Sequence, residues 1–408
     1  MKCRHCKTPL VNTFLDLGFA PPSNAYLAAE NLNRPEKYYP LRVLVCDQCW
    51  LVQTEDYAEA GELFTSDYAY FSSTSAGWLA HARSYASDMI GRFALGKDSF
   101  VIEVASNDGY LLRNFVAAGI PCLGIEPTAG TAAAAEVLNI PVLREFFGEA
   151  TGLRLANEGR QADIIAGNNV YAHVPDINDF TRGLAAALKP GGTITLEFPH
   201  VMRLIQQAQF DTVYHEHFSY LSLFTAARIF ETCGLRVYDV EELPTHGGSL
   251  RVYGCHAGAG LAVTSRVKIL LDTEAEFGLQ NAEIYAGFQA VANKVKDDLL
   301  EFLIAEKRKN RKVVGYGAAA KGNTLLNYAG VKPDLVAYIC DAAPSKQGKF
   351  MPGSHIPIVA PDILSKGKAD AVLIFPWNIC KEIASQLASL LPPKVEIWVG
   401  VPNIRRIA

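Results

Sequence analysis

One short stretch of the sequence, FDTVYHEHFSYLS, is rich in side chains that can act as bases, proton donors or metal ligands. It contains Tyr214, His215, Glu216, His217 and Tyr220, although the chain has only 9 histidines in 408 residues. Histidine titrates near neutrality and is therefore the most common general base in enzymes. The stretch is a candidate for metal binding, for acid/base catalysis or for polar filling of a loop.

Metal binding by this stretch is disfavoured on geometric grounds. Successive side chains of a strand point to opposite faces, so His215, Glu216 and His217 cannot easily converge on one ion. The helical His-Glu-x-x-His spacing of many zinc enzymes is also absent. We therefore expect no catalytic metal here.

A better metal site lies in the first fifty residues. Four of the nine cysteines form two Cys-x-x-Cys pairs, Cys3 with Cys6 and Cys46 with Cys49. Two such turns brought together give four thiolate ligands, the usual structural zinc site. Redox pairs are the alternative, but neither pair lies in a βαβ context. With four protein ligands the zinc would be closed to substrate, and His5 is expected to be a bystander.

The elements that must position these residues follow from the alternation of strands and helices between about residues 100 and 260. Buried apolar runs predict strands, and amphipathic runs between them predict helices. This order is typical of a doubly wound parallel sheet, here with one antiparallel strand at the end. The predicted strands are 99–106, 121–127, 162–170, 193–199, 235–243 and 247–255, and the predicted helices are 109–119, 128–139, 176–192 and 223–234.

Ligands of such sheets bind at the carboxyl ends of the strands. The first strand carries Glu103 and runs into a turn with Gly109, and the second ends at Glu126. The turn lacks the G-x-G-x-x-G pattern, which disfavours a nicotinamide cofactor. A carboxylate at the second strand end can accept both ribose hydroxyls, so an adenosine ligand fits. The alternative is that both carboxylates are ordinary strand-end charges.

The motifs EVASNDGYLL, GIEP, GNNVYAHVPDINDF, LKPGGTITLEFP and DTVYHEHFSYLS together resemble the S-adenosylmethionine-dependent sugar C-methyltransferases. These enzymes methylate a carbon of a nucleotide-linked 4-keto-deoxysugar, so deoxysugar biosynthesis is the expected setting. The cysteine pairs and the C-terminal third match the same family. The resemblance implies a zinc-binding domain (1–65), a class I methyltransferase domain of Rossmann-like fold (66–262) and a smaller Rossmann-like domain (263–408).

The resemblance also implies which residues hold the cofactor. They lie in the turn after the first strand, at the end of the second strand and at the end of the third. The implied set is Glu103, Ala105, Asn107, Asp108, Gly109, Glu126, Pro127, Asn168 and Asn169.

Carbon methylation requires a nucleophilic carbon. In a 4-keto sugar the ketone acidifies the proton at C3, a base removes it, and the enolate carbon attacks the methyl group of the sulfonium. By resemblance His217 is the base, with Glu216 and Tyr214 as site partners and Tyr214 suited to donate to a substrate oxygen. His173, just past a strand end, is expected to face the reactive methyl, although a structural loop histidine stays open.

Two upstream tyrosines, Tyr68 and Tyr70, are further candidates. One of them should cap the site, and the sequence does not choose between them. His215 and Tyr220 receive no role. His246, beside two glycines, is best read as part of a turn before a strand.

The C-terminal third begins with a long helical run, 273–310, with a break expected near Gly278 or Gly287. The segment KVVGYGAAAKGNTLL then predicts strand, glycine turn and helix, an arrangement that can bind phosphate. Three readings are open. In the first, Gly315, Gly317 and Lys321 hold the diphosphate of the sugar nucleotide. In the second, the domain only shapes the cleft, and in the third it binds NAD.

Composition narrows the function classes. The net charge is −4 and the pI is near 6.2, which disfavours a nucleic-acid binder. We see neither a signal peptide nor an apolar run of membrane-spanning length, so the cytoplasm is the expected compartment. The partner is therefore expected to be a small molecule, and no motif indicates an oligomeric state. The alternatives to a methyltransferase are an NAD-dependent oxidoreductase or epimerase and a non-catalytic zinc-containing binding module.

Overall fold

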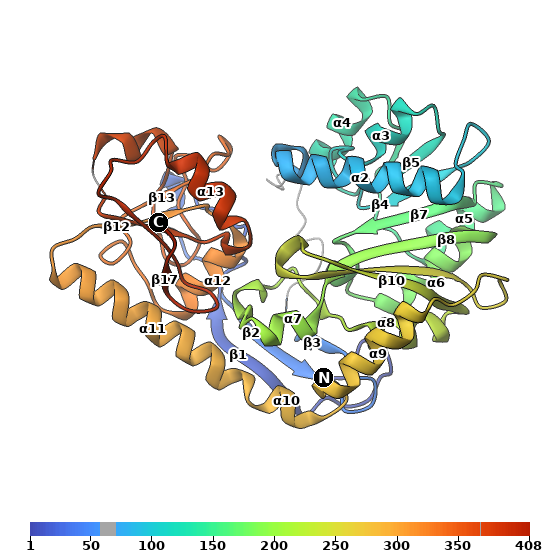
Figure 1. Cartoon of the computed structure of the whole chain (residues 1–408), viewed down its shortest axis with the longest axis horizontal. Coiled ribbons are helices and arrows are strands. Elements are labelled where there is room, and N and C mark those ends of the chain that lie inside the picture. The colour runs from blue at the N-terminus through green and yellow to red at the C-terminus, as the bar shows by residue number, and fades with distance from the viewer. Residues whose placement is uncertain (58–70, 368) are drawn as a thin grey trace.

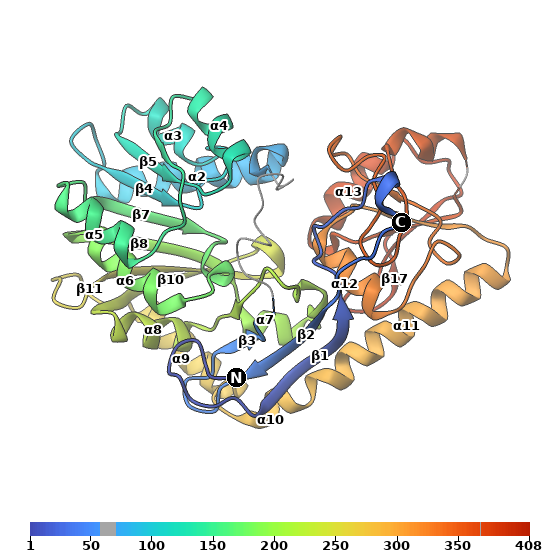
Figure 2. The ribbon, with the colours of Figure 1, turned by 180° about the vertical axis from the view of Figure 1, so that it is seen from behind.

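The computed structural model describes residues 1–57, 71–367 and 369–408. Figures 1 and 2 show two lobes, one built on a seven-stranded sheet and the other on a six-stranded sheet. A four-stranded sheet near the N-terminus lies beneath and between them. Together with the four-cysteine cluster described below, these sheets confirm the predicted fold class of a zinc-binding domain and two Rossmann-like domains. None of the described helices is long and apolar enough to span a membrane.

The middle lobe is a mostly parallel sheet with the strand order β10-β11-β8-β7-β4-β5-β6. Strand β11 is antiparallel to both of its neighbours, and the other pairs are parallel, which confirms the single antiparallel strand expected from the sequence. The strands are β4 (Val101–Val104), β5 (Cys122–Ile125), β6 (Val142–Leu143), β7 (Ala162–Asn168), β8 (Leu188–Pro199), β10 (Leu235–Leu243) and β11 (Ser249–His256).

Helices cover this sheet, and the four predicted ones are present with shorter bounds. They are α3 (Leu112–Ala117), α4 (Ala129–Val137), α6 (Ile177–Ala187) and α8 (Leu223–Thr232). Helices α2 (Ala76–Phe93) and α5 (Glu149–Asn157) were not predicted. The signal for α2 is nevertheless in the sequence. Its buried residues Ala82, Tyr85, Ala86 and Met89 recur at helical spacing, and the Ser75 side chain accepts from the backbone N–H of Trp78 as an N-cap.

The end of the predicted helix 176–192 is wrong. The helix stops at Ala187, and the following Lys-Pro-Gly-Gly segment belongs to strand β8. An added Cβ at Gly192 would lie 2.9 Å from the carbonyl oxygen of Ala162, so glycine permits the close approach of β7. Pro190 is tolerated because the β7–β8 pairing is irregular at this point.

The N-terminal sheet takes one strand from elsewhere in the chain. Its order is β1-β2-β3-β9, made of β1 (Asn12–Ala20), β2 (Tyr39–Val45), β3 (Val52–Thr54) and β9 (Ser219–Tyr220). Strand β9 belongs to the histidine-rich stretch, which otherwise is a 3-10 turn, η4 (Phe210–Thr212), followed by irregular chain. The sequence-based assumption of a strand through His215–His217 is therefore wrong.

The C-terminal lobe is a second, smaller sheet with the order β14-β13-β12-β15-β16-β17, parallel except for β17. The predicted long helix starts earlier than expected and breaks at both glycines, giving α9 (Ser265–Phe277), α10 (Ala282–Ala286) and α11 (Phe288–Arg308). Gly278 ends α9 with a left-handed φ of 95°. The other elements are β12 (Val313–Tyr316), α12 (Ala320–Tyr328), β13 (Ile339–Cys340), β14 (Ile358–Val359), β15 (Ala371–Ile374), α13 (Cys380–Leu387), β16 (Glu396–Val399) and β17 (Arg405–Arg406).

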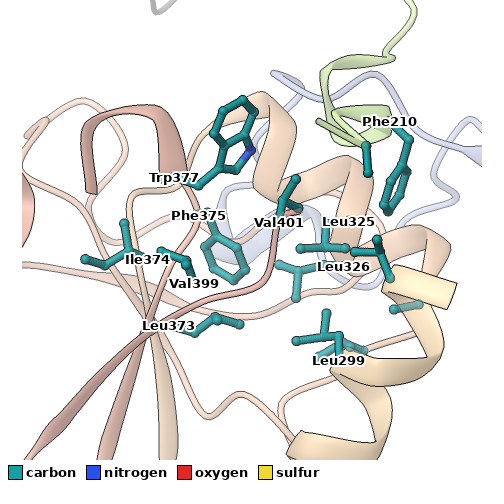
Figure 3. Packing of buried hydrophobic residues seen from close by; sticks show 14 of the residues in the cluster. Phe210, Leu299, Leu325, Leu326, Leu373, Ile374, Phe375, Trp377, Val399 and Val401 are labelled. Carbon is teal, nitrogen blue, oxygen red and sulfur yellow. The ribbon is translucent and has the colours of Figure 1, made fainter. Parts of the chain in front are cut away.

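The hydrophobic cores cross the domain boundaries proposed from the sequence. One cluster joins the N-terminal sheet, the segment from α7 (Val201–Gln206) to η4, and the C-terminal domain. Figure 3 shows Phe210 of η4 beside Leu325 and Leu326 of α12, and its ring also meets the Tyr328 ring edge-on at 5.6 Å. A second cluster joins the cysteine turns to the middle sheet. The segment just before the histidines is thus packed into the C-terminal core.

Candidate active site between three domains

The four cysteines of the N-terminal turns form a closed cluster. Their sulfur atoms all lie within 4.8 Å of one another, and the Cys3–Cys49 and Cys6–Cys46 sulfur pairs are 3.5 Å apart. A disulfide would require about 2.05 Å. Tetrahedral thiolates around zinc, with Zn–S bonds of about 2.3 Å, lie roughly 3.8 Å apart. The cluster fits zinc, and no other metal-type group of three ligands occurs among the described residues.

Arg4, inside the first cysteine turn, ties this cluster to the candidate catalytic stretch. The side chain is buried and donates to the carbonyl oxygen of Phe218 at 3.1 Å, to that of Thr54 at 2.8 Å and to that of Pro175 at 3.1 Å. It also pairs with the carboxylate of Asp56. The cysteine turns therefore hold the end of the histidine-rich stretch.

The turn after β4 has an unusual backbone. Ala105, Asn107 and Gly109 all have left-handed φ values, 57°, 50° and 78°. The carboxylate of Glu126, at the end of β5, accepts the N–H of Asn107 at 3.0 Å and the N–H of Thr128 at 2.9 Å. Glu126 thus braces both strand-end loops, and its predicted contact with a ribose stays a prediction.

Several polar atoms in and beside this turn are buried with no hydrogen-bond partner among the described residues. They are the Ser106 hydroxyl, Oδ1 of Asp108 and both amide atoms of Asn168 at the end of β7. Native proteins leave few buried polar atoms unsatisfied, so such a group at strand ends points to a polar ligand. These residues fit the adenosine and amino-acid groups of S-adenosylmethionine.

The remaining predicted cofactor residues lie around the same strand ends. Glu103 is fully buried in β4, and burial raises the pKa of its carboxyl group well above the usual range. Ala105 and Pro127 lie in the loops after β4 and β5. Asn169 is already engaged, because its side-chain amide lies 2.8 Å from Nε2 of His246.

Two histidines meet where the histidine-rich stretch passes this sheet edge. The rings of His173 and His217 are 4.6 Å apart, edge to face. Nδ1 of His217 lies 2.8 Å from the carbonyl oxygen of Thr212, and Nδ1 of His173 lies 2.8 Å from that of Glu216. Because a carbonyl only accepts, each Nδ1 carries the proton and each Nε2 carries the lone pair.

Both rings are neutral in this environment. Burial lowers the pKa of His173 to about 4. Burial lowers the pKa of His217 well below its usual range, the charge of Lys321 contributes in the same direction, and a proton on His173 would also oppose a charge on His217. A neutral ring of fixed tautomer is the form that accepts a proton.

The predicted site partners of His217 differ in how close they come to its ring. The centre of the Tyr214 ring lies 4.0 Å from the centre of the His217 ring. The Glu216 carboxylate accepts from the Asn24 amide at 2.8 and 2.9 Å. The backbone carbonyl of Glu216 accepts from Nδ1 of His173 and so orients the His173 ring. Nε2 of His215 instead lies 3.3 Å from the carbonyl oxygen of Tyr39, in the N-terminal sheet.

The sequence reasoning missed a buried group that joins this stretch to the C-terminal lobe. The indole N–H of Trp377 donates to Oδ2 of Asp211 at 2.7 Å, and burial raises the pKa of Asp211 to about 6. The ammonium of Lys321 lies 4.4 Å from the centre of the Trp377 ring and donates to Oδ1 of Asn378 at 2.7 Å. Only Lys321 was predicted, and for a different contact.

A second missed group centres on Glu197 in β8. It is fully buried and receives Nε2 of His81 at 2.9 Å, the Thr245 hydroxyl at 2.9 Å and the Arg251 guanidinium at 3.1 Å. Burial alone would raise the pKa of Glu197, but His81 and Arg251 hold it below its usual value. A carboxylate inside the predicted buried strand TITLEFP was the available signal.

The glycine turn of the C-terminal domain is closed. The N–H of Gly317 donates to Cys340 at 2.7 Å, that of Ala318 to the Asp341 carboxylate at 2.7 Å and that of Ala319 to Gly317 at 2.8 Å. Gly315 lies inside β12, where an added Cβ would be 2.5 Å from the Phe375 ring. Packing explains both glycines without a phosphate.

Tyr68 and Tyr70, the predicted capping tyrosines, lie outside the described residues.

Comparison with known proteins covers the whole chain. Three family models match: "Putative zinc binding domain" over residues 3–64, "Methyltransferase domain" over 78–240 and "C-methyltransferase C-terminal domain" over 244–402. The last begins before β11, which the structure places in the middle sheet.

Relatives agree with these models. The chain is 31% identical to the C-methyltransferase NovU of Streptomyces niveus over 407 residues, which is 100% of this chain and 97% of that protein. It is 30% identical over 98 residues to the uncharacterized methyltransferase ML2584 of Mycobacterium leprae, covering 24% of this chain and 36% of that protein. Among solved structures, magnesium protoporphyrin IX methyltransferase of Synechocystis with bound SAM overlaps 44% of this chain and 80% of its own, at 15% identity and a TM-score of 0.34.

Proposed function

This chain belongs to the S-adenosylmethionine-dependent C-methyltransferases with a structural zinc site, and we propose that it methylates C3 of a nucleotide-linked 4-keto-deoxysugar. The observation that supports this most is the pair of neutral histidines, His173 and His217. Both present an unprotonated Nε2 beside a sheet edge that has unsatisfied polar atoms for the methyl donor. Methylation of a carbon next to a ketone requires a base beside the methyl donor, and His217 and His173 meet that requirement.

The first step is removal of the C3 proton by Nε2 of His217. The C3–H electron pair moves to the C3–C4 bond, and the ketone oxygen becomes the enolate oxygen. The carbonyl of Thr212 keeps its hydrogen bond to Nδ1 as the ring becomes charged. Burial makes the resting ring a weak base, and the negative charge developing on the enolate offsets this by favouring the imidazolium. The proposal gives Tyr214, whose ring lies against the His217 ring, the role of donating to a substrate oxygen.

S-adenosylmethionine supplies an electrophilic methyl group to the enolate carbon. Ser106, Asp108 and Asn168 would hold it, since their buried polar atoms lack partners in the described part of the chain. Glu126 and Asn107 keep the two loops in place.

A small-molecule substrate is consistent with a site made by three domains. Asn24 comes from the N-terminal domain, His173 and His217 from the middle domain and Lys321 from the C-terminal domain. The diphosphate role of Gly315 and Gly317 stays a prediction, and their N–H groups already have acceptors in the protein. We also propose the cytoplasm as the compartment, because all nine cysteines are unpaired.

The test is a turnover assay with a panel of thymidine-, uridine- and guanosine-diphosphate-linked 4-keto-deoxysugars. Mass spectrometry should detect a mass gain of one methylene unit on one of these sugars, and NMR should place the methyl group at C3. In deuterated water without methyl donor, the same sugar should exchange its C3 proton. Methylation at an oxygen or nitrogen, or transfer to none of these sugars, would refute the proposal.

A further inference from the structure

The side chain of Lys321 points toward the candidate active site and not toward the glycine turn that precedes it in the sequence. Lys321 is the second residue of α12, and its side chain leaves the turn and lies over Trp377. The Trp377 ring is a common surface for three segments. Its N–H binds Asp211, and an added Cβ on Gly247 would lie 2.5 Å from its Cη2. Lys321, in α12, is the third residue in contact with this ring.

Two of these segments, those of Asp211 and Gly247, carry histidines of the site. Asp211 precedes Thr212, whose carbonyl holds His217. Gly247 follows His246, which lies against Asn169 at the end of β7. The charge of Lys321 acts on the titration of both His217 and His246, which agrees with an ammonium facing the histidines.

The ammonium has capacity for a ligand. Of its three N–H donors, Asn378 takes one, at 2.7 Å. Burial lowers the pKa of Lys321, whereas the charge of Asp211 acts in the opposite direction. The diphosphate is a poor candidate for the remaining donors, because Asp341 and two backbone carbonyls already take the turn N–H groups that a phosphate would need.

We propose that Lys321 is a catalytic residue whose ammonium binds the ketone oxygen of the substrate and stabilises the enolate formed there. This role rests on the proposed function. As His217 takes the C3 proton, the electron pair released from the C3–H bond moves into the ring and negative charge gathers on the C4 oxygen beside the ammonium. When C3 takes the methyl group of S-adenosylmethionine, the S–CH3 bond electrons stay on sulfur and the C4 carbonyl re-forms. Lys321 keeps its proton throughout.

The test separates this role from diphosphate binding. Lys321→Met keeps the length of the side chain and removes its charge. We expect kcat to fall about 100- to 1000-fold, as when an enzyme loses one oxyanion donor. The rate of C3 proton exchange in deuterated water should fall with it. The Kd of the nucleoside diphosphate without sugar, measured by calorimetry, should stay within about twofold of wild type.

Two further variants serve as a second test and a control. Asn378→Ala removes the acceptor that positions Nζ and should lower kcat in the same direction by a smaller factor, which keeps the test open if Lys321→Met is unstable. Lys332→Met, just beyond the other end of α12, loses a lysine that donates to the carbonyl of Gly353 and should leave kcat near normal.

Three results would decide against the proposal. An unchanged kcat with weaker nucleoside diphosphate binding would show that Lys321 binds the diphosphate and not the ketone oxygen. Unchanged values for both would leave it a structural residue. A wild-type enzyme that turns over none of the panel sugars would remove the proposed substrate class and this role together, whereas the first two results leave the substrate class intact.

Discussion

The chain contains two strand–turn–helix units of the same design, and they differ in where their unsatisfied polar atoms lie. In the turn after β4, Ser106, Asp108 and nearby Asn168 keep buried polar atoms without partners among the described residues. In the turn after β12, backbone N–H groups of residues 317–319 all donate to the protein itself. In the second unit, both amide atoms of Asn323 are buried without a partner among the described residues, but this residue lies in α12 and not in the turn.

The carboxylate of Asp341 makes the difference at the second turn. It accepts the N–H of Ala318, and the carbonyl of Ala318 in turn accepts Tyr26 at 2.6 Å and Lys346 at 2.8 Å. The second turn has more glycine and looks more like a phosphate site, yet it is the closed one. Glycine content alone therefore does not show that a turn has free N–H groups for a ligand.

The largest effect is expected from replacing His217, the proposed base beside the turn after β4. His217→Asn should lower kcat by about 1000-fold or more, because a positioned base contributes up to about four orders of magnitude. Binding of S-adenosylmethionine, measured by calorimetry, should be retained, since His217 contacts Thr212 and His173 rather than the β4 turn. Near-normal turnover would move the base to His173 or His246.

Acid should destabilise the protein because the candidate site contains buried neutral histidines. The folded pKa values of His173 and His246 are lowered by burial to about 4, below the unfolded value of about 6.5. The unfolded chain therefore takes up protons first, and stability present above pH 6.5 is lost as the pH falls toward 4. Asp211, with a pKa raised to about 6, acts in the opposite direction over about pH 4–6 and offsets part of the loss.

The net loss in free energy of unfolding should be about 2 kcal/mol between pH 7 and pH 5. Denaturant unfolding at several pH values measures it, and His246→Gln should flatten the profile. A wild-type stability that rises on acidification over this range would contradict the burial of neutral histidines.

A matched pair of glycine substitutions compares the two turns directly. Gly109 has φ 78°, and an added Cβ would lie 2.4 Å from Ile140, while Gly317 has φ 85° and the added Cβ would lie 2.5 Å from Pro376. Both alanine variants should lose about 2 kcal/mol of stability through strain and crowding. Only Gly109→Ala should also weaken S-adenosylmethionine binding, by about tenfold or more. Equal losses of affinity would show that the second turn also serves the cofactor.

The smallest effect is expected from opening the second turn. Asp341→Asn keeps one oxygen acceptor and should lower the free energy of unfolding by about 1 kcal/mol. The kcat and the affinity for S-adenosylmethionine should not change. Thermal shift with NAD should give no stabilisation of either wild type or variant. Stabilisation of the wild type by NAD would show that the closed turn does bind a dinucleotide.

The sequence alone predicted most of the architecture because the longer strands of the two large sheets leave a local signal, whereas the two-residue strands β6, β14 and β17 do not. Buried runs such as AVLI in β15 and the helical period of α6 depend on neighbouring residues only. The exceptions are instructive. Strand β9 has two residues and exists because β3 lies beside it, and the Pro-Gly-Gly segment of β8 is a strand because β7 approaches it closely.

The site was predictable in its residue types and not in its contacts. His217, His173 and Tyr214 do come together. The orientation of the two histidine rings depends on the carbonyls of Thr212 and Glu216. Every residue has a main-chain carbonyl, so the residue types do not indicate which one accepts the hydrogen bond. The Asp211–Trp377 bond joins residues 166 positions apart, so no spacing in the sequence could indicate it.

Strand β9 has a consequence for how the chain matures during synthesis. The hydroxyl of Thr54 donates to the carbonyl of His217, 163 residues later, and the core beneath β1 and β2 includes residues of α11 and α12. A ribosome that has made the zinc turns has therefore made a sheet that lacks its last strand and its packing partners. Contacts this distant form slowly. The N-terminal region must wait for nearly the whole polypeptide, so a nascent chain will need protection of those apolar strands until the final lobe emerges.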